Sequence, residues 1–116
     1  MTPEQIERNR AFIRDLRANP LKATDCMRGP SGERCCLCVA YDTALSKGAK
    51  LANASANLPP DELAEFYGWL HRNPMLEFQG RRYSAVALND GVGGAPELTH
   101  AEIADAFEET FPEIKP

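Results

Sequence analysis

The segment from Arg34 to Asp42 most constrains what this chain of 116 residues can fold into. It holds three of the four cysteines, Cys35, Cys36 and Cys38, among leucine, valine and alanine. Small and apolar residues recur there at spacings of three and four, which predicts a helix with a wide buried face. Because small side chains let neighbouring elements approach closely, we expect this helix to be central, with Cys36 the most enclosed thiol.

The same thiols raise two chemical alternatives, a zinc site and a nucleophilic cysteine. Structural zinc sites present two separated pairs of ligands, whereas this segment offers one pair, and adjacent helical residues diverge by about 100°. A nucleophile needs a base, which His71 or His100 would supply with Asp90 to orient it, and no pattern brings these residues to the thiols. The sequence therefore predicts no catalytic residue, metal or cofactor, and leans against an enzyme without excluding one.

Length and composition indicate a single small globular domain over residues 1–116. The hydrophobic share of 43% and the charged share of 26% are ordinary for soluble proteins. A chain of this length can bury one core without disulfides. No apolar run has the length of a membrane span, and the charged start has no signal-peptide core. We expect no membrane association, a cytoplasmic location in a host bacterium, and reduced thiols.

Capping boxes mark the first and last of the expected helices. Thr2 with Gln5 begins one helix, which ends before Pro20 because the residue preceding a proline leaves the α region. Thr99 with Glu102 begins the other, near the C-terminus. Both signatures are local, so these helices are expected whatever the tertiary fold.

A third helix is expected after Pro60, ending at Asn73 because Pro74 follows. Trp69 lies off its apolar stripe, which predicts a second contact or partial exposure for that side chain. The stripe itself consists of Leu63, Phe66, Tyr67 and Leu70.

A small hairpin is expected next, from residues 75–78 and 82–84 around the turn Gln79-Gly80-Arg81. A two-stranded ribbon is marginal alone and must pack on helices. Residues 85–88 predict a helical turn leading out of it. The predicted fold class is mainly α, with about four helices and a small β-hairpin packed around one core.

Basic residues are concentrated in the N-terminal third, with seven Lys/Arg against five Asp/Glu in residues 1–34. The acids interleave with the bases, which is typical of a solvated helix with intrahelical pairs. A nucleic-acid-binding regulator is the alternative function that this charge allows. Its binding residues would be Arg8, Arg10, Arg14, Arg17, Arg81 and Arg82.

Acidic residues are concentrated in residues 97–116, with six acids against Lys115 alone. Such a surface argues against phosphate binding there, and it suits either solubility or docking of a basic partner. The candidate partner-binding residues are Glu97, Glu102, Asp105, Glu108 and Glu109.

Five segments keep a recognisable order along the chain: Phe12–Arg17, Cys35–Asp42, Leu58–Trp69, Leu88–Asp90 and His100–Asp105. In that order the chain resembles a family of small phage- and prophage-encoded proteins, mostly uncharacterised. Members carry a Cys-Cys-Leu-Gly-Val-Leu-Cys-Asp segment, a Leu-Pro-Pro helix with a Trp, a Leu-Asn-Asp turn and a final Phe-x-x-Ile-Ala-Asp helix. This chain departs from the pattern with Cys38 in place of Gly and Tyr41 in place of the third Cys, an exchange typical of packing.

The resemblance implies an accessory role during phage infection or lysogeny. The leading hypothesis is a non-enzymatic protein that binds a host protein or protein complex stoichiometrically. It includes inhibition of a host defence complex, as an anti-CRISPR protein does. The nucleic-acid-binding regulator is the second hypothesis, and a cysteine-dependent enzyme or zinc-binding protein is the third. A homo-oligomer remains compatible with all three.

Overall fold

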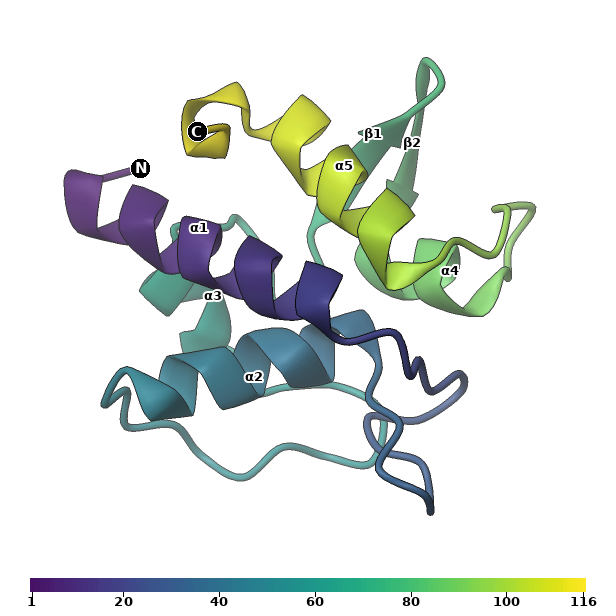
Figure 1. Cartoon of the computed structure of the whole chain (residues 1–116), viewed down its shortest axis with the longest axis horizontal. Helices are drawn as coiled ribbons and strands as arrows, with labels where there is room; N and C mark the ends of the chain where they lie inside the picture. Colours follow the sequence, from purple (N-terminus) through teal and green to yellow (C-terminus); the bar gives the residue numbers. More distant parts are fainter.

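The computed structural model describes residues 1–116 and contains five α-helices, one β-hairpin and a final 3₁₀ turn (Figure 1). The prediction of a mainly α fold with a small hairpin is confirmed. One helix more than expected is present, because the helical turn predicted after the hairpin is a short α-helix at residues 85–90. None of the helices is both long and apolar enough to cross a lipid bilayer. In chain order the elements are α1 (Pro3–Ala18), α2 (Cys36–Ser46), α3 (Glu62–Tyr67), β1 (Met75–Phe78), β2 (Arg81–Ser84), α4 (Ala85–Asp90), α5 (His100–Thr110) and η1 (Pro112–Ile114).

Both expected capping boxes are present. The Thr2 hydroxyl accepts the amide N–H of Gln5 while the Gln5 side chain accepts the amide N–H of Thr2. Thr99 and Glu102 make the same reciprocal pair at the start of α5. Each box satisfies two N–H groups that the first helical turn otherwise leaves without a partner.

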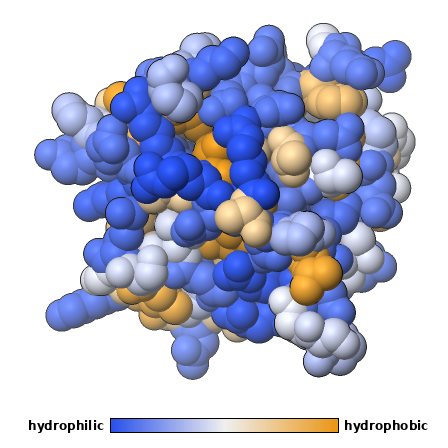
Figure 2. All heavy atoms as spheres, in the orientation of Figure 1, coloured by the Kyte–Doolittle hydropathy of each residue, from blue (hydrophilic) through white to orange (hydrophobic).

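The helices surround one apolar cluster of 24 buried residues. Figure 1 shows α1 between α2 and α5, and α5 packs on the hairpin through β1. The cysteine helix α2 is enclosed as predicted, because seven of its 11 residues are buried. It is less central than expected, since α1 contacts more elements: α2, α3, α5 and η1. The outer face in the same view is mainly hydrophilic, with apolar atoms in small separate patches (Figure 2).

The third helix is shorter than predicted. It ends at Tyr67 because Gly68 takes a left-handed conformation with φ of 78°, and the Trp69 N–H then bonds back to the carbonyl of Ala64. The prediction that Leu70 belongs to a buried stripe is wrong, because the chain has left the helix and this side chain is fully exposed.

Trp69 lies in the core and makes the second contact that its off-stripe position predicted. Its ring stacks on Tyr67 with centroids 4.6 Å apart. Its indole N–H donates to Oδ1 of Asn9 over 2.9 Å, and Nδ2 of Asn9 donates to the carbonyl of Tyr67 over 2.8 Å. This buried amide therefore joins α1 to the chain that follows α3.

The hairpin pairs Met75 with Ser84 and Phe78 with Arg81, so Arg81 belongs to the second strand and not to the turn. Only Gln79 and Gly80 connect the strands, with φ of 51° and 79°. Positive φ at both positions is the geometry of a two-residue type I′ turn, whose twist matches that of the strands.

Candidate functional site

The three thiols of the cysteine segment are buried. Cys36 and Cys38 have no exposed surface and Cys35 is 5% exposed, which confirms the predicted burial. Burial raises the pKa of all three thiols, to about 12 for Cys38. A thiol reacts as a nucleophile through its thiolate, so the raised pKa keeps these three groups neutral and weakly nucleophilic at neutral pH.

Cys35 has a structural role that the sequence analysis missed. It is the N-cap of α2, and its Sγ accepts the amide N–H of Cys38 over 3.3 Å. The spacing of three residues between these two cysteines is the sequence signal for that bond. A helix N-terminus favours a thiolate, yet desolvation is the larger influence on Cys35, and it raises the thiol pKa.

Asn89 fixes the same helix end from a distant part of the chain. Its Oδ1 accepts the amide N–H of Cys36 over 3.0 Å, and its Nδ2 donates to the carbonyl of Ala23 over 2.8 Å. The main-chain carbonyl of Asn89 accepts a bond from Nζ of Lys22 over 2.6 Å. The segments Cys35–Asp42 and Leu88–Asp90 are therefore bonded to each other.

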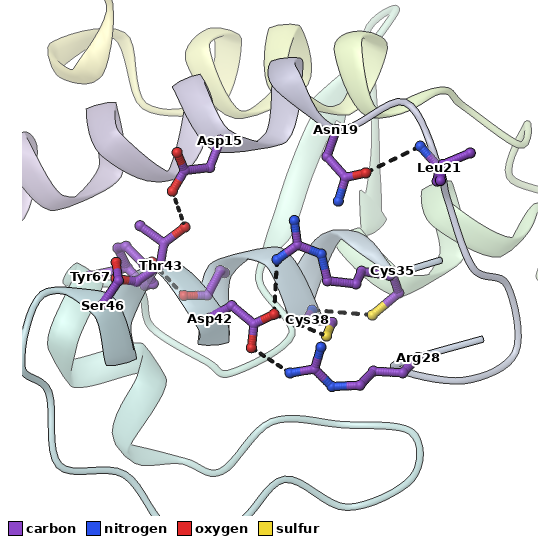
Figure 3. Close-up of polar contacts among 12 residues, drawn as sticks. Asp15, Asn19, Leu21, Arg28, Cys35, Cys38, Asp42, Thr43, Ser46 and Tyr67 are labelled. Carbon is purple, nitrogen blue, oxygen red and sulfur yellow. Dashed lines mark hydrogen bonds and ion pairs between the residues drawn. The ribbon is translucent and has the colours of Figure 1, made fainter. Parts of the chain in front are cut away.

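Asp42 is the centre of a polar cluster on the outer side of α2 (Figure 3). Its carboxylate binds the guanidinium groups of Arg28 and Arg34, both in the connection between α1 and α2. The Sγ of Cys38 lies 4.0 Å from Oδ2 of Asp42. With both arginines held by one acid, the cluster anchors this connection to α2.

A polar cavity of about 510 Å³ lies between α1 and α2, next to that cluster. Asp15 on α1 accepts the hydroxyl proton of Thr43 on α2 over 2.6 Å, which closes one side of it (Figure 3). Asn19, Arg34 and Asp42 also line the cavity. Its one cation, Arg34, already binds Asp42, so the cavity presents no free charge of that sign to a ligand.

The histidines proposed as bases do not meet the thiols in one site. The ring of His71 is exposed and accepts the N–H of Asn73. His100 is 3% exposed and its Nδ1 contacts the carbonyl of Asn19 over 2.5 Å. Cys26 is the only half-buried thiol. No three His, Cys, Asp or Glu residues are grouped as a metal ion would need.

Three of the four candidate arginines on α1 bind groups within the chain. Arg8 lies over the Phe66 ring at 4.3 Å and donates to that residue's carbonyl. Arg10 donates to three carbonyls of the C-terminal segment 113–115. Arg17 binds two acids of α5. No hydrogen bond or ion pair within the chain is made by the side chains of Arg14, Arg81 and Arg82.

Most of the acidic candidates also have internal partners. Asp105 and Glu108 bind Arg17 at 2.7 Å each, and the bond to Glu108 raises the pKa of that guanidinium. Glu97 binds Lys22 at 3.1 Å. Glu102 completes its capping box, and neither it nor Glu109 forms an ion pair, so two exposed acids of the set have no cation. Three of these five acids thus have a cation within the chain, and because Asp105 and Glu108 share Arg17, the surface keeps most of its negative charge.

An apolar surface that the sequence analysis missed lies where α3, the hairpin and the end of α5 meet. Leu70 is fully exposed there and Met75 is 48% exposed. Both line a cavity of about 260 Å³ together with Arg82 and the C-terminal end of α5. Gly68 was the available signal, because a glycine ending the helix leaves Leu70 outside it. We define the Leu70 surface as the five residues Leu70, His71, Met75, Arg82 and Phe111.

No family of known proteins matches this chain, and neither does any curated protein or solved structure. The observations that bear on function are therefore the enclosed thiols, the internally paired charges and the Leu70 surface.

Proposed function

We propose that this chain is a non-enzymatic binding protein that acts by stoichiometric attachment to another protein. The observation that carries the proposal is Leu70, a large apolar side chain fully exposed beside a cavity of about 260 Å³. Isolated exposed leucines are common, but this one adjoins a cavity and a half-exposed Met75, so it can act as the central apolar anchor of an interface. The enclosed, poorly ionised thiols support binding over cysteine chemistry.

The resemblance to small phage-encoded proteins indicates the class of partner. A phage accessory protein of this kind would bind a host protein or complex, and a host defence complex, CRISPR machinery included, is the target we propose. Attachment without chemistry requires the inhibitor in at least equal amount to its target. A chain of 116 residues is economical to make in that quantity.

Affinity capture from host lysate with matched leucine variants tests this function. The chain and its Leu21→Ser variant, changed at a leucine 57% exposed outside the Leu70 surface, should recover the same partner in a one-to-one complex. Leu70→Ser should weaken that complex at least about tenfold, because hot-spot residues carry most of the binding energy. Recovery of no partner at low salt, or equal recovery by all three proteins, would contradict the proposal.

A further inference from the structure

The residues that line the cavity beside Leu70 differ in charge from the protein as a whole. The whole chain carries a net charge of −4, yet the cavity is lined by one cation, Arg82, and by no acid. Arg82 is exposed and makes no ion pair. Its apolar lining consists of Leu70, Met75 and Phe111.

Strand pairing places Arg82 and the apolar Met75 on one face of the hairpin. Met75 pairs with Ser84 and Glu77 with Arg82, and side chains two residues apart on a strand share a face. Met75 and Arg82 therefore project from the same face, while Leu76 projects from the other face into the core. Glu77 shares the outer face, but it neither lines the cavity nor forms an ion pair with Arg82.

From this arrangement, and resting on the proposed function, we infer that the Leu70 surface binds a protein segment that combines one large apolar side chain with an adjacent carboxylate. The cavity of about 260 Å³ holds the apolar side chain against Leu70 and Met75. Arg82 binds the carboxylate, a pairing for which the planar guanidinium is well suited. The Leu70 surface thus selects a partner that presents both a negative charge and an apolar side chain.

A second copy of the chain fits this surface less well. Two copies related by a two-fold axis bury the same patch on both sides. The Arg82 guanidinium groups of both chains would then share one contact that no cavity-lining acid neutralises. Like charges in a desolvated contact oppose association, so the charge of the surface favours a different, acidic partner.

Fluorescently labelled peptides of about ten residues, the length of a typical docked segment, test the inference. One peptide has a central Leu-Phe pair flanked by Asp and Glu, the second replaces the acids with Lys, and the third keeps the acids but replaces Leu-Phe with Ala-Ala. The first should bind at low salt and weaken as salt is added, and the other two should bind at least about tenfold more weakly.

Two variants and a control locate the binding. Arg82→Glu and Leu70→Ser should each weaken binding of the acidic Leu-Phe peptide at least about tenfold. Arg14→Glu changes an exposed arginine of α1 by the same charge and should leave binding unaltered. Absence of binding, or binding that Arg82→Glu leaves unchanged, would overturn the inference.

Two further measurements separate competing occupants. A DNA or RNA oligonucleotide that binds through Arg82 more tightly than the acidic peptide would overturn the inference in favour of nucleic acid. A dimer in sedimentation equilibrium that Leu70→Ser dissociates would overturn it in favour of a second copy. If the peptides fail while lysate capture still depends on Leu70, only the partner chemistry is wrong and the proposed function stands. If capture does not depend on Leu70, the proposed function itself fails.

Discussion

The four thiols differ in how far solvent reaches them. Cys26 is half-buried and its Sγ contacts the carbonyl of Arg28, whereas the other three lie in the core. Cys36 and Cys38 have no exposed surface at all. Reaction of a buried thiol requires the surrounding elements to open first, so exposure should separate one thiol from the other three.

A disulfide reagent added to the native protein should therefore modify one thiol quickly. We expect Cys26 to react first and the remaining thiols more than about 100-fold more slowly, because exposing them requires an opening free energy of several kcal/mol. With an aromatic disulfide as the reagent, each reaction releases an aromatic thiol, and the absorbance of that thiol measures both phases. Cys26→Ser should remove the fast phase and leave the slow one, while two or more fast thiols would show that α2 is less enclosed than described.

His100 links stability to pH. Burial lowers the pKa of its imidazole below the ordinary value of 6.5, and the nearby cations Lys22 and Arg34 act in the same direction. The unfolded chain therefore takes up a proton below pH 6.5 that the folded chain resists. Its contribution to stability is complete above that pH and is lost as the pH falls below it.

Urea unfolding at about pH 7.5 and about pH 5.5 measures this linkage. The free energy of unfolding of the native chain should fall more between the two conditions than that of His100→Asn, whose side chain does not titrate and carries an amide group near the position of Nδ1, which contacts the Asn19 carbonyl. Carboxylates titrate in both proteins, so the difference isolates the histidine. An equal fall in both proteins would assign the pH dependence elsewhere.

At the scale of elements, the end of α4 depends on a close approach that a glycine permits. Gly91 caps α4 with φ of 70°, and a Cβ there would lie 2.8 Å from Cβ of Glu97 and 3.2 Å from its backbone nitrogen. Gly93 has a similar φ of 62° with no atom within 4 Å of such a Cβ. A side chain at either position would be strained by the positive φ, but only a side chain at position 91 would also be crowded.

Alanine substitution at both glycines separates strain from crowding. Gly93→Ala should lower the free energy of unfolding by about 1 kcal/mol, the cost of a left-handed alanine. Gly91→Ala should lower it by a further 1–2 kcal/mol or so, because the loop before α5 must move. Thermal unfolding of the two variants side by side gives the comparison, and equal losses would exclude the contact with Glu97 as a constraint.

Element starts could be read from the sequence, and one important end could not. The boxes at Thr2 and Thr99 are local, so the starts of α1 and α5 were predictable from four residues each. The end of α3 depends on Gly68 instead of on the later Pro74, and both signals are present in the sequence. Choosing between them needs the packing of Trp69 on Asn9 of α1, 60 residues away.

The candidate surfaces were less predictable than the elements. Residue type correctly marked Arg17 and Glu108 as charged, but their 2.7 Å ion pair joins helices that are remote in sequence. Leu70 was assigned to the core on periodicity alone, because its exposure follows from where the helix stops. Surface function depends on such long-range contacts, and single-sequence patterns do not encode them.

At the scale of the whole molecule, α1 packs against α2, α3, α5 and η1. Arg10 holds the C-terminal segment through the carbonyls of Glu113, Ile114 and Lys115, at 3.1–3.3 Å. Figure 1 shows this segment returning beside the helix with which the chain begins. Arg14, one turn further along, makes no such bond and is exposed.

Arg10→Ala should release the C-terminal segment from α1. We expect a loss of about 1–2 kcal/mol in the free energy of unfolding, since the bonds involve a charged donor and are partly solvated. Arg14→Ala should change it by less than about 0.5 kcal/mol. Amide hydrogen exchange at Glu113, Ile114 and Lys115 should quicken in the first variant alone. Unchanged exchange there would mean that Ile114, which is buried, holds the segment without Arg10.

The hydrogen bonds of Asn89 determine which positions of this sequence tolerate substitution. Its side chain bonds main-chain atoms at positions 36 and 23, so mutation at either position leaves both bonds possible. Mutation at position 89 removes both at once. In a saturation mutagenesis selected for folding, position 89 should tolerate fewer amino acids than position 23, although alanine and asparagine are about equally buried there. A lineage descended from this chain would then keep its asparagine while the residues it fastens are exchanged.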